Sequence, residues 1–129
     1  MKNSSIFEIV KLMATKQEVE NFLIEFKGKM QIWDVLFRSD RDSNIQALAD
    51  LDIRPIDRKI ILEKLKPTDY SEGPIEEKLH GGSNMWVFGK EIKKQEVYIK
   101  ITMGSANQPV ICISFHRAKF KMNFPLKTR

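Results

Sequence analysis

Two segments near the end of the chain alternate between apolar and polar residues, and this alternation constrains the fold more than any other feature. In Val97–Met103, and again in Ile111–His116, apolar side chains stand at every second position. Side chains of a β-strand point to opposite faces with period two, so each segment is predicted to be a strand with one apolar and one polar face. Because a one-residue slip would bury the polar set, like faces must pair in the hairpin.

The predicted register sets three pairs opposite one another on the polar face: Tyr98 and His116, Lys100 and Ser114, and Thr102 and Cys112. A phenol, an ammonium group and an imidazole then share one sheet face. Such groups transfer protons and bind phosphate, and His116 is one of only two histidines in the chain. The simpler alternative is an exposed polar face that only keeps the protein in solution.

The composition is that of an ordinary globular protein and predicts a single domain spanning residues 1–129. Hydrophobic residues make up 42% and charged residues 30% of the chain, both ordinary values. No apolar run is long enough to cross a bilayer, so we expect no membrane partner. The single cysteine cannot form an internal disulfide and fits a reducing compartment, which predicts a cytoplasmic location.

The positive charge lies almost entirely in the second part of the chain. Residues 1–77 contain 12 Lys and Arg and 15 Asp and Glu, whereas residues 78–129 contain 10 Lys and Arg against Glu91 and Glu96 alone. A basic region of this kind suggests a polyanionic partner. The alternative is a solvated basic surface that binds nothing.

Residues 13–66 are predicted to be mainly helical. Thr15–Met30 has the spacing of an amphipathic helix and begins with a capping-box pattern, while residues 1–12 are either a flexible arm or an extra helical turn. Ser43–Leu51, with Ile45, Leu48 and Ala49 on its inner face, and Pro55–Leu65 are the second and third helices. A short strand, Ile32–Phe37, precedes them.

Residues 85–118 are predicted to be a β-meander, whose first strand is Met85–Ile92. Lys66–Asn84 reads as a long loop with one helical turn at Ile75–Leu79, and Phe120, Phe124 and Leu126 are expected to form a covering segment. Helices followed by strands indicate an α+β fold, with the N-terminal helices packed on the apolar face of a C-terminal antiparallel sheet.

The candidate catalytic residues are His116, Tyr98 and Lys100. Histidine can accept or donate a proton near neutral pH, a phenol can donate or relay one, and cations stabilise the charge of a pentavalent phosphate. With Arg117, Lys119 and Lys121 close by, the set suits cleavage of RNA at its own 2′-hydroxyl. This reaction needs neither a metal nor a cofactor.

A second basic group surrounds the Met85–Ile92 strand. Lys90, Lys93 and Lys94 could bind backbone phosphates while Trp86 and Phe88 stack on bases. The alternative is that both aromatic side chains belong to the core and the lysines mark a turn. With one cysteine and two histidines, the chain has no ligand set for a structural zinc site.

Four stretches together resemble the MqsR-type toxins of bacterial toxin–antitoxin systems, within the RelE-like group of mRNA-cleaving toxins. They are Leu65–Tyr70, Met85–Trp86, Val97–Thr102 and Ile113–His116. The resemblance covers roughly residues 65–118. It implies a small RelE-like α+β fold, metal-independent cleavage of mRNA, and neutralisation by a cognate antitoxin protein.

The resemblance also implies roles for individual residues. Tyr98 falls on the family's functional tyrosine, and His116 stands where the family usually has a lysine. Val87 replaces a glutamine, and the family's loop lysine has no direct match, so that Lys78 or Lys90 would take its place. With Arg117 and Lys119, which follow His116 directly, the predicted phosphate-binding residues are Lys90, Arg117, Lys119 and Lys78.

Three functions remain open from the sequence. The first is an endoribonuclease toxin that acts on mRNA. The second is a non-catalytic nucleic-acid-binding module that uses the same basic region. The third is a protein-interaction domain for an acidic partner. Cleavage distinguishes the first from the others.

Overall fold

The computed structural model describes residues 13–39, 42–76 and 82–127, which form an α+β fold. The helical elements are α2 (Lys16–Trp33), α3 (Asp42–Asp50), α4 (Pro55–Glu63) and the 3₁₀ turn η1 (Pro67–Asp69). The strands are β1 (Val35–Phe37), β2 (Tyr70–Ile75), β3 (Met85–Ile92), β4 (Gln95–Thr102) and β5 (Val110–Arg117). They form one sheet in the order β1-β5-β4-β3-β2, in which only the β1–β5 pair is parallel.

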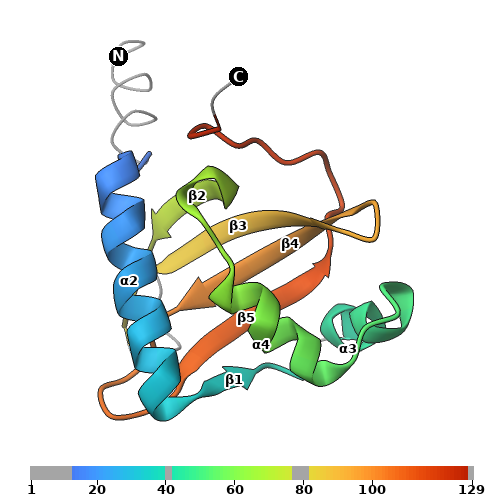
Figure 1. Ribbon diagram of the computed structural model, residues 1–129, viewed down its shortest axis with the longest axis horizontal. Helices are drawn as coiled ribbons and strands as arrows, with labels where there is room; N and C mark the ends of the chain where they lie inside the picture. The colour runs from blue at the N-terminus through green and yellow to red at the C-terminus, as the bar shows by residue number, and fades with distance from the viewer. Residues whose placement is uncertain (1–12, 40–41, 77–81, 128–129) are drawn as a thin grey trace.

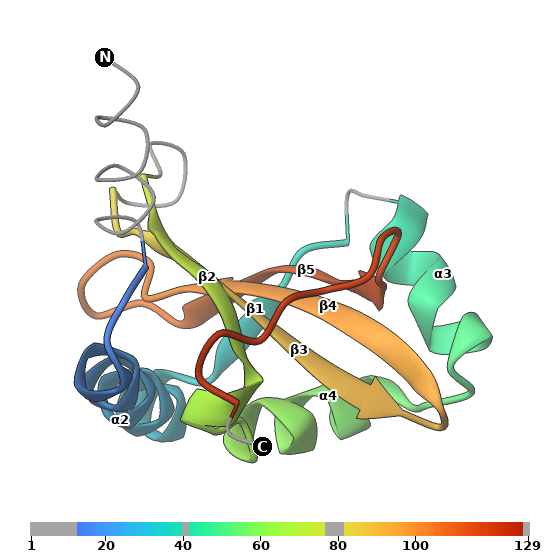
Figure 2. The same ribbon diagram turned by 90° about the horizontal axis from the view of Figure 1, so that it is seen from above.

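Helices α2 and α4 lie on the same side of the sheet, as Figures 1 and 2 show, which confirms the predicted helix-on-sheet arrangement. The predicted apolar stripe of α2 is buried, with Val19 and Phe26 fully so. Thr15 and Glu18 form the predicted capping box, each side chain accepting a hydrogen bond from the other residue's backbone N–H. Phe22 stacks on Trp86 of β3 with ring centroids 4.5 Å apart, which ties α2 to the sheet.

Several predicted boundaries and faces in the helical part are wrong. Helix α2 continues to Trp33, so β1 is shorter than the strand predicted from Ile32, because Asp34 with a φ of 69° ends the helix only there. Helix α3 buries Asn44 and Ala47 rather than the predicted set, and the Ile45 side chain is 55% exposed. Asn44 is buried because its side-chain amide forms hydrogen bonds with the backbone of β5, as described below.

The loop predicted between Lys66 and Asn84 contains a strand that the sequence pattern missed. After η1, the chain forms β2, which pairs with β3 at the edge of the sheet. Gly73 and Pro74 have low strand propensity, so a propensity-based prediction misses this strand, but an edge strand tolerates a proline. Ile75 ends β2 rather than starting a helical turn, and Glu76 after it is not helical. Residues 77–79 of that predicted turn lie outside the described residues.

The hairpin of β4 and β5 has the predicted register over its outer half only. Tyr98 pairs with His116 and Lys100 with Ser114, but then the register shifts, so that Ile101 pairs with Cys112 and Thr102 with Ile111. Ile113 is the extra residue of this β-bulge, which reverses the direction of the side chains that precede it. The predicted pairing of Thr102 with Cys112 is therefore wrong.

The bulge moves Cys112 from the polar face into the core, where its side chain is 2% exposed. Burial raises the pKa of the thiol to about 12. At pH 8 this pKa leaves on the order of one thiol in 10⁴ ionised, against roughly a quarter for an ordinary thiol.

We therefore expect Cys112 to resist thiol reagents in the native protein. Native protein mixed with an aromatic disulfide reagent at pH 8 should release chromophore at least about 100-fold more slowly than protein in 6 M guanidinium chloride. The measurement is unambiguous because the chain has a single cysteine. Equal rates in the two conditions would contradict the buried position.

Candidate functional site

The structure brings together the three side chains predicted to be catalytic. Tyr98 of β4 and His116 of β5 are directly opposite, and their rings stack with centroids 5.3 Å apart and planes 12° apart. The Lys100 ammonium nitrogen lies 5.9 Å from the centroid of the Tyr98 ring. The stack orients the imidazole ring, and the Lys100 ammonium group adds positive charge near the Tyr98 ring.

The hydrogen bonding of His116 defines its tautomer. Its Nδ1 lies 2.9 Å from the carbonyl oxygen of Arg117. A carbonyl oxygen can only accept, so Nδ1 donates and carries the proton in this arrangement. In the neutral ring, Nε2 is then the nitrogen with a lone pair, and no described residue donates a hydrogen bond to it. The geometry leaves this nitrogen as a proton acceptor.

His116 lines a pocket of about 380 Å³ between the end of β5 and α3, together with Ser43, Asp50, Arg117, Ala118 and Lys119. Arg117 lies across it, with one guanidinium nitrogen 3.5 Å from an Asp50 carboxylate oxygen and the other donating to the Gln95 side chain at 3.3 Å. Lys119 is exposed at the rim. The pocket therefore combines an imidazole, two cationic side chains and one carboxylate.

The other predicted phosphate-binding lysines are not part of this pocket. Lys90 pairs in register with Val97, which faces the helices, and its ammonium group forms an ion pair with Asp69 at 3.0 Å. It thus points to the face opposite Tyr98 and His116. Lys78 lies outside the described residues.

The aromatic side chains of β3 belong to the core, as the simpler alternative holds. Phe88 is fully buried, and Trp86 packs against the core through Phe22. The Phe88 ring is therefore closed to a base, and Trp86 is partly buried with one ring face stacked on Phe22. Lys93 lies in the turn between β3 and β4. Its ammonium group forms an ion pair with the Asp52 carboxylate at 3.6 Å.

Sequence reasoning did not assign Ser43, Asp50 or Asn44 to the site, and α3 brings all three to the end of β5. The Asn44 amide nitrogen donates to the Ile113 carbonyl oxygen at 2.9 Å, and its amide oxygen accepts from the Phe115 N–H at 3.1 Å. Strand β1 ends at Phe37 and does not reach this part of β5. The Asn44 side chain therefore takes the place of a neighbouring strand and holds β5 just before His116.

The C-terminal segment, residues 118–127, packs beside the stacked rings. Gly89 pairs with Tyr98, and a Cβ at Gly89 would come within 2.7 Å of the Phe124 ring and 2.8 Å of the Met122 sulfur. Only glycine leaves room for this contact. Phe124 and Leu126 thus cover the fold as predicted, whereas the Phe120 side chain is 86% exposed.

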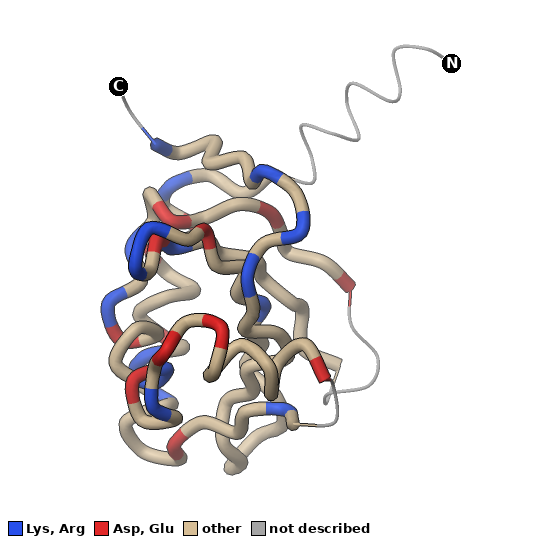
Figure 3. The backbone as a smooth tube through the Cα atoms, turned by 90° about the vertical axis from the view of Figure 1, so that its right-hand side faces the viewer, with Lys and Arg blue, Asp and Glu red and all other residues tan. Residues whose placement is uncertain are grey.

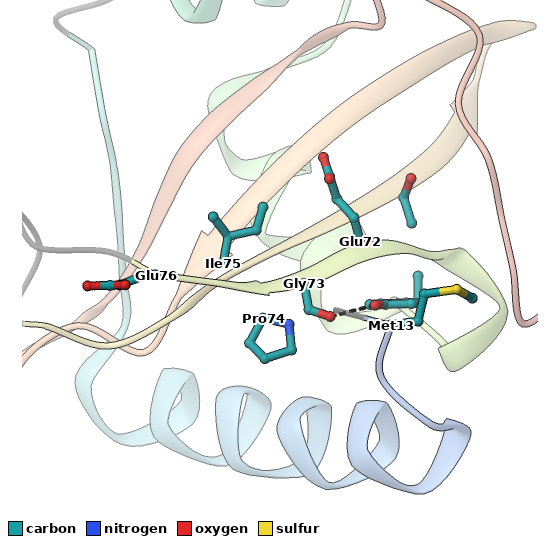
Figure 4. Close-up of a pocket in the computed structure, with 8 residues that line it drawn as sticks. Met13, Glu72, Gly73, Pro74, Ile75 and Glu76 are labelled. Atoms are coloured by element: carbon teal, nitrogen blue, oxygen red, sulfur yellow. Dashed lines mark hydrogen bonds between the residues drawn. The ribbon is translucent and has the colours of Figure 1, made fainter. Parts of the chain in front are cut away.

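A second pocket, of about 420 Å³, lies at the other end of the strand order. It is formed by Met13 and β2, and Figure 4 shows Glu72 and Glu76 at its rim and the Gly73 carbonyl that accepts a hydrogen bond from the Tyr70 hydroxyl. Because β4 and β3 separate β2 from β5, this pocket does not adjoin His116. Its charged groups are carboxylates, which do not attract a polyanion.

Over the part of the chain that the structure describes, no three His, Cys, Asp or Glu side chains converge on a common point where a metal ion could bind. Within the same residues, no helix has the length and apolar character needed to span a membrane. Comparison with protein-family models, curated proteins and solved structures finds no match to this chain.

Proposed function

We propose that this protein is a metal-independent endoribonuclease that cleaves mRNA through the 2′-hydroxyl group. The observation that supports this proposal most strongly is the arrangement of His116. Its ring is held by Tyr98 and by the Arg117 carbonyl, its Nε2 remains an acceptor, and it lines a pocket that contains Arg117 and Lys119.

The chemistry follows from these groups. Nε2 of His116 removes the proton of a 2′-hydroxyl, and the 2′-oxygen attacks the adjacent phosphorus. As the bond between phosphorus and the 5′-oxygen breaks, the Tyr98 hydroxyl supplies a proton to that oxygen. The products are a 2′,3′-cyclic phosphate and a 5′-hydroxyl end. Lys100, Arg117 and Lys119 stabilise the charge on the phosphate in the transition state.

The cationic groups differ in how readily they reach a phosphate. Arg117 must exchange its contact with Asp50 for the substrate, whereas Lys119 has no such partner among the described residues. Arginine binds phosphate through two parallel hydrogen bonds, so the exchange gains geometric fit as well as charge.

The sequence resemblance supports a toxin role, in which a cognate antitoxin protein would block this activity. Because mRNA is the proposed substrate, the activity belongs in the cytoplasm. Free toxin of this kind would be expected to stop growth when it is produced without its antitoxin.

The deciding experiment uses the purified full chain in EDTA with a labelled DNA oligonucleotide that contains a single ribonucleotide. We expect cleavage only on the 3′ side of the ribose, with a 2′,3′-cyclic phosphate end detected by mass spectrometry. The all-deoxy oligonucleotide should remain intact, because it lacks the attacking hydroxyl. Binding of both without cleavage would contradict the proposal and favour a nucleic-acid-binding module.

A further inference from the structure

Phe120 is the most exposed large apolar side chain among the described residues, with 86% of its surface open to solvent. It stands between Lys119 and Lys121, which are both exposed as well. A single exposed apolar residue is ordinary in a folded protein. Phe120 differs because the chain on each side of it is anchored.

One residue of β4 holds both sides of the bend. The Ala118 N–H donates to the Glu96 carbonyl oxygen at 2.8 Å, and the Met122 N–H donates to the Glu96 carboxylate at 2.9 Å. Beyond the bend, Met122 and Phe124 pack over Gly89. The bend between these anchors therefore presents the Phe120 ring to solvent at a defined place.

The bend directly follows the pocket that His116 lines. Ala118 and Lys119 belong both to the pocket wall and to the bend. Figure 3 shows blue Lys and Arg positions spaced along the C-terminal segment. In the sequence, Lys119 and Lys121 belong to this segment and Arg117 directly precedes it. An exposed aromatic ring thus lies between cationic side chains, a few residues from the imidazole.

We infer that Phe120 is a stacking platform for a base of a single-stranded nucleic acid whose phosphates contact Lys119 and Lys121. The inference rests on the proposed function for its choice of ligand. It extends that function by naming residues that bind the substrate. An aromatic face stacks on any base, while neighbouring cations follow the phosphate backbone. In a duplex the bases are stacked on each other, so the site selects single strands.

The surroundings of Phe120 argue against a membrane or an acidic protein as the ligand. Membrane insertion and protein docking both use contiguous apolar surface. Along this bend the next apolar side chain, Met122, is only 9% exposed and faces the sheet. An isolated ring flanked by two lysines matches an alternation of bases and phosphates better.

The test measures equilibrium binding of the full chain to a fluorescent, single-stranded 2′-O-methyl RNA 12-mer, which the proposed reaction cannot cleave. Phe120→Ala and Phe120→Leu should each weaken binding by about 5- to 100-fold, whereas Phe120→Trp should bind at least as tightly as the wild type. Ile24→Ala is the matched control, because Ile24 is also an exposed apolar residue (70%) and lies on α2, away from the end of β5.

The salt dependence separates the ring from the lysines. Phe120→Ala should leave the slope of log K against log salt unchanged, whereas Lys119→Gln with Lys121→Gln should reduce it by about 1.4, at roughly 0.7 for each phosphate contact. Duplex RNA of the same length should bind more weakly than the single strand, and Phe120→Ala should not affect it.

Contrary results are equally clear. The inference is overturned if Phe120→Leu binds the RNA as tightly as the wild type does. It is also overturned if anionic lipid vesicles or poly-glutamate displace the RNA from the wild type but not from Phe120→Ala. If Phe120→Ala cleaves a ribose-containing strand with the same KM as the wild type, the inference is overturned while the ribonuclease proposal stands. Binding that depends on Phe120 without any cleavage would support the inference and overturn the ribonuclease proposal.

Discussion

Replacement of His116 by alanine is expected to lower the rate of RNA cleavage by about 10²- to 10⁴-fold, the usual contribution of a general base. The reason is that Nε2 of His116 is the nitrogen that this tautomer leaves as a proton acceptor, and His116 lines the pocket. The fold should survive, because His116 is only half-buried and lies at the end of β5. Single-turnover rates with saturating enzyme would measure the effect on the chemical step, and thermal unfolding would check the fold.

Three companion experiments give the His116 prediction its specificity. His116→Phe keeps an aromatic ring against Tyr98 but has no nitrogen, so it should be as inactive as His116→Ala. Added imidazole should restore part of the activity of His116→Ala by supplying the missing base. Tyr98→Phe keeps the stack and removes the hydroxyl, so its rate should also fall. Wild-type rates in His116→Phe would show that the base lies elsewhere.

Replacement of Asn44 by alanine is expected to reduce the free energy of unfolding by about 2–4 kcal/mol, because a buried polar group left without its partner costs about 1–3 kcal/mol. The change leaves the Ile113 carbonyl and the Phe115 N–H unpaired in a buried place, since Asn44 itself is only 3% exposed. A loss of this size corresponds to a decrease in melting temperature of roughly 10 °C. Urea denaturation followed by circular dichroism would measure it.

Two variants show whether the effect comes from the amide of Asn44. Gln46→Ala removes an exposed amide from the same helix, which among the described residues donates to the Asp50 carboxylate. This change should alter stability by no more than about 0.5 kcal/mol. Asn44→Asp keeps the shape but sets a second acceptor against the Ile113 carbonyl, so near neutral pH it should be at least as unstable as Asn44→Ala. A stable Asn44→Asp protein would mean that the side chain only fills space.

The bulge at Ile113 explains why the sequence predicted one half of the hairpin and not the other. Alternation is a local property, and it correctly placed Tyr98, Lys100 and His116 on one face. The inserted residue cannot be seen in this pattern, because Ile111, Ile113 and Phe115 keep the two-residue spacing of apolar side chains through the bulge. The prediction therefore carried the alternation past the bulge and assigned Cys112 to the wrong face.

The missed strand β2 and the inner face of α3 have a related cause. Propensity disfavours a strand that contains Gly73 and Pro74, yet pairing with β3 supplies hydrogen bonds that outweigh this preference. In α3, periodicity selected Ile45 as buried because it is apolar. The structure buries Asn44 instead, since the uncovered edge of β5 requires hydrogen-bond partners and not apolar surface.

The sequence by itself determined the α+β order of the chain, the amphipathic helix of residues 15–30, and the shared face of Tyr98, Lys100 and His116, because each follows from short-range periodicity. Only the tertiary structure decided what surrounds that face. It turned Lys90 toward Asp69 on the opposite side, brought Asp50 and Ser43 of α3 to His116, and left Phe120 exposed. These outcomes depend on which segments meet in space, and local sequence patterns do not encode the packing that brings them together.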